Sequence, residues 1–93
     1  MITPDTNKSV RARLARVEGQ VRGVGRMLDE GRYCIDVITQ IQAIKAALGK
    51  VEELILADHV DTCVEHALAD GDLTERRAKV DELLKVLPRM GRG

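Results

Sequence analysis

Apolar residues recur through the middle of this 93-residue chain in alternating steps of four and three, the spacing of one helix face. The positions are Val37, Ile41, Ile44, Leu48, Val51 and Ile55. The stretch from Tyr33 to Asp70 has no proline and one internal glycine, so the pattern predicts a single helix over about residues 33–70. Such a helix would be roughly 55 Å long, far longer than a small domain is wide. We therefore expect a second chain to lie beside it.

The same alternation occurs earlier in the chain and predicts a first helix. Its apolar positions are Val10, Leu14, Val17, Val21, Val24 and Leu28. Thr3, Pro4 and Asp5 are typical of a helix start, because they supply a threonine cap, a proline at the first helical position and an acid in the first turn. The helix should run to about Glu30, with Gly31 ending it.

A third helix is predicted after the Asp70–Gly71–Asp72 stretch. Asp72, followed three residues later by Glu75, resembles a capping box with an acidic cap. One apolar stripe follows, made of Val80, Leu83, Leu84 and Leu87. We expect this helix to stop before Pro88, because proline cannot donate the backbone hydrogen bond that continues a helix.

These elements predict an all-α protein with three helices of unequal length, forming a single domain over residues 1–93. The first two helices, joined by the short Gly31–Arg32 turn, should pair antiparallel. Two such pairs related by a two-fold axis would make an antiparallel four-helix-bundle dimer, with the third helix attached outside. A chain of this length buries only a marginal core alone, which also favours an oligomer.

Composition and charge add two constraints. The chain has no Trp or Phe and one Tyr, so its core is aliphatic. No apolar run approaches the roughly 20 residues needed to cross a bilayer, and the N-terminus lacks the apolar core of a signal peptide. We therefore expect a cytoplasmic protein with no membrane contact. Residues 1–50 carry nine Lys and Arg against five Asp and Glu, whereas residues 51–93 carry six against ten.

The basic excess is concentrated on the polar faces of the first helix. Its cationic residues are Lys8, Arg11, Arg13, Arg16, Arg22 and Arg26, and between the first and last of them only Glu18 carries the opposite charge. A solvated surface would explain an isolated basic helix. Surface helices normally intersperse both signs, however, so an anionic partner is the competing interpretation.

Candidate chemistry is confined to the long central helix. The hydroxyl residues show no nucleophile context and no glycine-rich phosphate loop follows a strand, which argues against an enzyme. His59 and Cys63 are four residues apart and present both side chains on one helix face, a spacing used for metal capture. Cys34 falls within roughly 20° of both in azimuth, but about 37 Å from His59 along the axis.

An antiparallel copy of the helix would bring these ligands together. With the two-fold axis near Ala47 and Leu48, Cys34 of one chain would lie beside His59 and Cys63 of the other, twice per dimer. Two thiolates and one imidazole form a soft three-coordinate set that suits Cu(I). Zn(II) would require a fourth ligand, which His66 could supply. The two cysteines could also bridge between chains, so a redox role stays open.

The segments RLARVEGQVRGVGRML, YCIDVITQI and DHVDTC resemble the copper-sensitive operon repressor (CsoR/RcnR) family, and the resemblance covers roughly residues 8–87. It implies a homotetramer, a disc-shaped dimer of dimers, that binds operator DNA in the apo form and is released by its inducer. Cys34, His59 and Cys63 match the Cu(I) ligands of the copper branch, with Cys34 from the opposite protomer.

Further positions carry over from the same resemblance. Tyr33 and Glu82 match residues beside the metal site that are thought to link it to DNA release. Arg13 matches a DNA-contacting arginine, and Lys50 stands where the family has a basic residue. The remaining arginines expected to extend that face include Arg11, Arg16 and Arg22.

Departures from sibling branches favour copper. The nickel and cobalt sensors are similar but histidine-rich, whereas residues 1–33 here contain no His and position 63 is Cys. The formaldehyde sensor has an N-terminal proline beside its cysteine; this chain has Ile2 and then Pro4. The persulfide sensor keeps both cysteines but lacks the histidine, so persulfide sensing through Cys34 and Cys63, without a metal, is the alternative. A helical scaffold that does not bind DNA is a more distant one.

Overall fold

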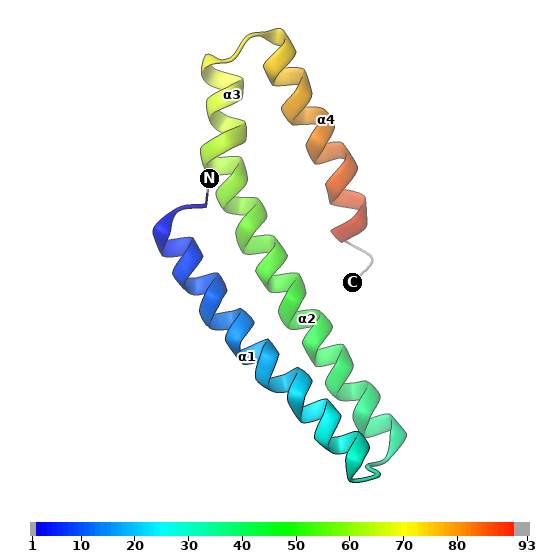
Figure 1. Cartoon of the computed structure of the whole chain (residues 1–93). Coiled ribbons are helices and arrows are strands. Elements are labelled where there is room, and N and C mark those ends of the chain that lie inside the picture. Colours follow the sequence, from blue (N-terminus) through cyan, green and yellow to red (C-terminus); the bar gives the residue numbers. More distant parts are fainter. Residues whose placement is uncertain (1, 91–93) are drawn as a thin grey trace.

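The computed structural model describes residues 2–90, and all of its regular structure there is helical. Helix α1 spans Pro4–Asp29 and α2 spans Cys34–His59. A π-helical turn, η1 (Val60–Val64), and α3 (Glu65–Asp70) continue α2 without a break, and α4 spans Leu73–Met90. The chain therefore consists of α1, the continuous α2–η1–α3 segment and α4 (Figure 1), and the all-α prediction is confirmed.

Local capping signals set the ends of α1. The Thr3 side chain accepts a hydrogen bond from the backbone N–H of Thr6, and proline occupies the first turn. At the other end, Gly31 adopts a positive φ of 66°, which a glycine reaches without strain. The backbone N–H of Arg32 donates to Met27 and that of Gly31 donates to Leu28, the pattern of a Schellman motif. Both predicted boundaries are therefore confirmed.

Two details differ from the sequence prediction. The expected uninterrupted α-helix contains a π turn at η1, where the N–H of Glu65 donates to Val60, five residues back. The third helix does not stop before Pro88 but continues to Met90. Pro88 removes one hydrogen bond only two residues from the end, where the backbone carbonyls of a helix begin to lose partners anyway. The predicted acidic cap at the start of α4 is present, because Asp72 Oδ1 accepts a hydrogen bond from the backbone N–H of Glu75 at 2.8 Å.

Helices α1 and α2 form an antiparallel hairpin whose buried residues repeat every seven positions (Figure 1). We call this set the inner stripe: Val10, Val17 and half-buried Val24 on α1, with Val37, Ile44 and Val51 on α2. It contains only β-branched residues, which pack the two helices along most of their length. This stripe is half of the apolar pattern seen in the sequence.

The other half of the pattern, the outer stripe, is left largely uncovered. Its exposed members are Leu14, Val21, Leu28, Ile41 and Leu48, and Ile55 is half-buried. The protomer measures 58 × 27 × 12 Å, so it is about one helix thick and has no second layer to cover this side. The predicted dimer and dimer of dimers would provide that layer, and they stay predictions. None of the described helices is long and apolar enough to cross a membrane.

Candidate metal and nucleic-acid sites

The first candidate ligand, Cys34, lies at the start of α2 and is exposed. Tyr33 precedes it as the capping residue, with 70% of its surface exposed. Both residues lie next to the turn that joins α1 to α2, at the opposite end of α2 from His59. Within one protomer, therefore, neither side chain can reach the other candidate ligand positions.

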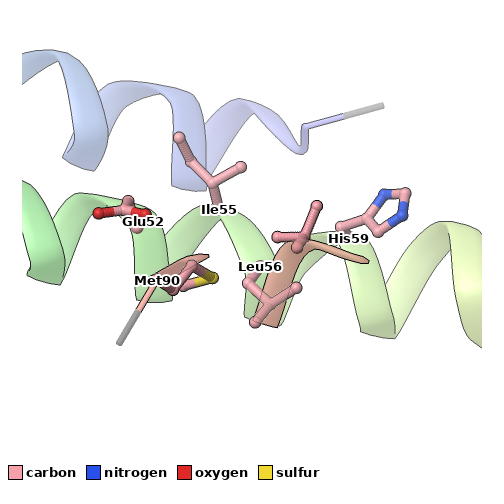
Figure 2. Close-up of a pocket in the computed structure, with 6 residues that line it drawn as sticks. Glu52, Ile55, Leu56, His59 and Met90 are labelled. Carbon is pink, nitrogen blue, oxygen red and sulfur yellow. The ribbon is translucent and has the colours of Figure 1, made fainter. Parts of the chain in front are cut away.

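His59 is the last residue of α2 and is half-buried. It lines an open groove of about 280 Å³ together with Leu56 and with Val86 and Met90 from α4. Figure 2 shows His59 and Leu56 on neighbouring turns of α2, with Met90 nearer to Glu52 than to His59. A neighbouring hollow is lined by both His59 and Glu82. His59 and Glu82 of α4 thus border the same hollow, and a role for Glu82 beside the metal site stays a prediction.

Cys63 lies inside the π turn and is half-buried. Its Sγ is 3.5 Å from the hydroxyl oxygen of Thr62. It shares a pocket with His66, whose Nδ1 is 3.3 Å from the carboxylate of Asp70. Because hydrogen bonds in a π turn reach back five residues, the rotation per residue is smaller than in an α-helix. On a continuous α-helix, Cys34, His59 and Cys63 would all point to the same side. Cys34 and His59 therefore keep this shared direction, whereas Cys63, inside the π turn, does not.

No three His, Cys, Asp or Glu side chains converge to hold a metal within residues 2–90 of a single chain. Cys34 and His59, at the two ends of α2, lie on the same side of the helix as the outer stripe residues Ile41 and Leu48, within about 40° in azimuth. Any partner that covers the outer stripe would therefore also cover both ligands. The donor set of two thiols and one imidazole is chemically suited to Cu(I).

The candidate DNA-contacting residues divide between the two broad faces of the hairpin. Relative to the inner stripe, Arg13, Arg16 and Lys50 turn away from the outer stripe, whereas Arg11 and Arg22 turn toward it. The latter two are engaged locally, since Arg11 donates to Asn7 and Arg22 pairs with Glu18 at 2.8 Å.

On the face that carries Arg13 and Arg16, the cationic side chains form fewer interactions with neighbouring residues than Arg11 and Arg22 do. Neither Arg13 nor Arg16 forms an ion pair or hydrogen bond with another described residue. Lys50 has only a long contact to Glu53 at 3.8 Å, on an exposed surface where such pairs contribute little. Three cations thus remain available to an external anion on the side opposite the outer stripe.

The chain is similar to proteins of known function. The profile of the family described as metal-sensitive transcriptional repressor matches residues 6–89. The chain belongs to this family. The expected kinship with CsoR/RcnR proteins is thereby confirmed, and the family is one of transcriptional repressors rather than enzymes.

Individual members of the metal-sensitive repressor family are similar over most of their length. The copper-sensing transcriptional repressor RicR of Mycobacterium tuberculosis is 47% identical, covering 78% of this chain and 82% of RicR. The Cu(I)-bound repressor CsoR of Geobacillus thermodenitrificans superposes with a TM-score of 0.85 at 39% identity, covering 98% and 94% of the two chains. The nickel-responsive regulator InrS gives 0.74 at 37% identity, over 89% and 90%.

One polar residue beside the site did not stand out in the sequence. Asp58 immediately precedes His59 and is only 9% exposed, the one charged side chain among residues 2–90 that is buried. Both of its carboxylate oxygens contact Thr3, at the start of α1. A signal for it existed, because Asp58 continues the seven-residue spacing of Val37, Ile44 and Val51 along the inner stripe.

Proposed function

We propose that this protein is a Cu(I)-responsive transcriptional repressor. In the absence of the inducer it binds operator DNA, and binding of Cu(I) releases it. The metal is held between two protomers, by Cys34 of one and by His59 and Cys63 of the other. The assembly is an antiparallel four-helix-bundle dimer that pairs further into a dimer of dimers.

One observation carries this proposal. Cys34 and His59 lie at opposite ends of α2, on the side that also carries the uncovered outer stripe. An antiparallel second copy packed on that stripe would cover its apolar surface and place Cys34 beside the other chain's His59. The same contact that stabilises the dimer would therefore complete the metal site.

The residues at each half-site fit a soft metal ion. Thiolate and imidazole ligands favour Cu(I), and the groove beside His59 is lined mainly by the apolar residues Ile55, Leu56 and Val86. Glu82 borders the same hollow as His59, and in the proposed site its carboxylate accepts a hydrogen bond from the second imidazole nitrogen and so orients the ring. Copper-sensing relatives at 47% and 39% identity support the same metal.

The DNA-binding part of the proposal is supported by the available cations. Arg13, Arg16 and Lys50 lie on the face opposite the outer stripe, so a dimer would leave them accessible. Arginine and lysine on such a face can neutralise phosphates of operator DNA, and binding should then weaken steeply with salt. Arg11 and Arg22 would extend the basic surface around the edges of the helix.

Replacing His59 tests the proposal. We expect His59→Ala to bind a labelled duplex from the region upstream of its own gene within about threefold of wild type, but not to be released by Cu(I). Fluorescence anisotropy with and without one equivalent of Cu(I) per protomer measures both quantities. His66→Ala is the matched control, because this histidine is exposed and paired with Asp70, and it should respond as wild type does.

Other outcomes would point to other inducers. Release of wild type by Ni(II) but not Cu(I) would make this a nickel sensor. A wild-type complex that ignores Cu(I) but dissociates with an inorganic polysulfide, in a manner that requires Cys34 and Cys63 but not His59, would make it a sulfur sensor. No complex with the upstream duplex at moderate salt would favour the scaffold interpretation.

A further inference from the structure

The inner stripe of the hairpin ends in a polar pair, Thr3 and Asp58. The backbone N–H of Thr3 donates to Asp58 Oδ2 at 2.8 Å, and the Thr3 hydroxyl lies 3.2 Å from Asp58 Oδ1. The same hydroxyl oxygen accepts from the N–H of Thr6 and caps α1. The buried carboxylate thus sits at the N-terminus of α1, where the helix dipole favours a negative charge.

Sequence spacing shows that this pair belongs to the packing register of the hairpin. Moving along the inner stripe, Val24 is matched with Val37, Val17 with Ile44, and Val10 with Val51, each step being seven residues in both helices. The next step in each helix is Thr3 and Asp58. A buried polar pair in an otherwise apolar seam fixes the register of two helices, since any shift would leave the carboxylate without partners.

The pair is also the one hydrogen-bonded connection between α2 and the α1 segment among residues 2–90. The other side-chain bonds that α1 and α2 form join residues three or four positions apart along the chain, including the bond that the Thr62 hydroxyl of η1 donates to the Asp58 carbonyl. Apart from it, the two helices are held by aliphatic contacts, which tolerate small sliding or rotation. The Thr3–Asp58 pair, in contrast, ties a defined point of α1 to the peptide unit next to His59.

We propose that Asp58 is a positioning residue that couples the metal ligand His59 to the DNA-binding helix α1 through Thr3. This inference rests on the proposed function. Asp58 shares a peptide bond with His59, so a change in backbone orientation when the imidazole is fixed by a metal moves the Asp58 carboxylate. Because Thr3 is hydrogen-bonded to this carboxylate, Thr3 moves with it. The start of α1, the helix that carries Arg13 and Arg16, then moves as well. Asp58 itself binds neither metal nor DNA.

Two variants weaken the pair from opposite sides. Thr3→Val removes the hydroxyl while keeping a β-branched side chain, and Asp58→Asn removes the charge and one acceptor oxygen. Thr3→Ser keeps the hydroxyl and is the conservative variant. Asp5→Asn is the matched control for the charge, because Asp5 also places a carboxylate at the N-terminus of α1 but is exposed. Thr39→Ala is the control for a threonine whose hydroxyl bonds only within its own helix.

The quantity to measure is the ratio of the dissociation constants for the upstream duplex with and without Cu(I). We expect this ratio to fall at least about tenfold in Thr3→Val and Asp58→Asn and to be restored in Thr3→Ser. The affinity for Cu(I), from competition with a chelator, should stay within about threefold of wild type. Because coupling is reciprocal, the effect of bound DNA on Cu(I) affinity should fall by the same factor. Both controls should match wild type.

Several results would overturn the proposal. Normal Cu(I) release in both variants would show that the pair does not transmit the signal, while leaving the proposed function intact. A loss of Cu(I) affinity that accounts for the lost release would place Asp58 in ligand binding instead. Loss of oligomeric state or helical content in both variants would make the pair a stability element only. Failure of wild type to release DNA with Cu(I) would overturn the proposed function together with the coupling.

Discussion

The inner and outer stripes of the α1–α2 hairpin share one sequence pattern but have opposite environments. Inner positions such as Ile44 are buried between the two helices, whereas the outer position Leu48, four residues away, is 39% exposed. The inner stripe is entirely β-branched, and the outer stripe includes three leucines. The comparison shows that the hairpin buries half of its apolar pattern internally and leaves the other half exposed, which is the surface that the proposed partner copy would cover.

The largest effect should come from charging the centre of the outer stripe. In Leu48→Glu, two like charges would meet near the proposed two-fold axis, so we expect association to weaken at least about a hundredfold. Sedimentation velocity at micromolar concentration would detect protomers in place of the oligomer. Gln42→Glu adds the same charge to an exposed position of α2 away from both stripes and should remain oligomeric. An intact Leu48→Glu oligomer would show that the outer stripe is not the interface.

A truncation in the inner stripe should act on folding rather than on assembly. Ile44→Ala leaves a cavity inside the hairpin, and we expect the free energy of unfolding to fall by about 3 kcal/mol. Urea denaturation at one fixed protein concentration measures this, and the folded fraction should still associate. Ile35→Ala removes the same atoms from an exposed position and should cost less than about 1 kcal/mol. Equal losses in both variants would remove the distinction between buried and exposed positions.

The smallest effect is expected at the end of the outer stripe. Leu28 is 64% exposed at the tip of the hairpin, so Leu28→Gln should change the free energy of unfolding by less than about 0.5 kcal/mol. Association, measured by the same sedimentation experiment, should weaken by less than about threefold. A loss comparable to that of Leu48→Glu would mean that the partner also covers the tip, and that the interface is not centred on the middle of α2.

Much of the fold could be predicted from the sequence because its signals are local. Thr3, Pro4 and Gly31 define the ends of α1 through capping and backbone geometry, and periodicity identifies the helices between them. The π turn could not be predicted, because its residues, Val60–Val64, have no feature that distinguishes five-residue from four-residue hydrogen bonding. Pro88 gave a misleading signal, since a proline near a helix end costs only one late hydrogen bond.

Of the candidate site, the sequence predicts the directions of those residues that lie on the regular part of the long helix. The shared side of Cys34 and His59 follows from the regular rotation of α2, which the structure preserves. The direction of Cys63 does not follow, because the π turn intervenes. The buried position of Asp58 was missed because residue type alone does not distinguish a buried aspartate from an exposed one. The seven-residue spacing was the one sequence signal, and the contact with Thr3, 55 positions away in the chain, is visible only in the structure.

The thickness of the protomer, about 12 Å along its shortest axis, has a consequence for how much of the protein a cell retains. In the proposed dimer, a second copy covers the apolar surface that a layer one helix deep exposes, so the stability of the protein would rise with its own concentration by mass action. Copies that remain unpaired spend more time unfolded and are the ones that proteases remove. We therefore expect abundance and assembly to be linked, with scarce copies degraded and paired copies retained.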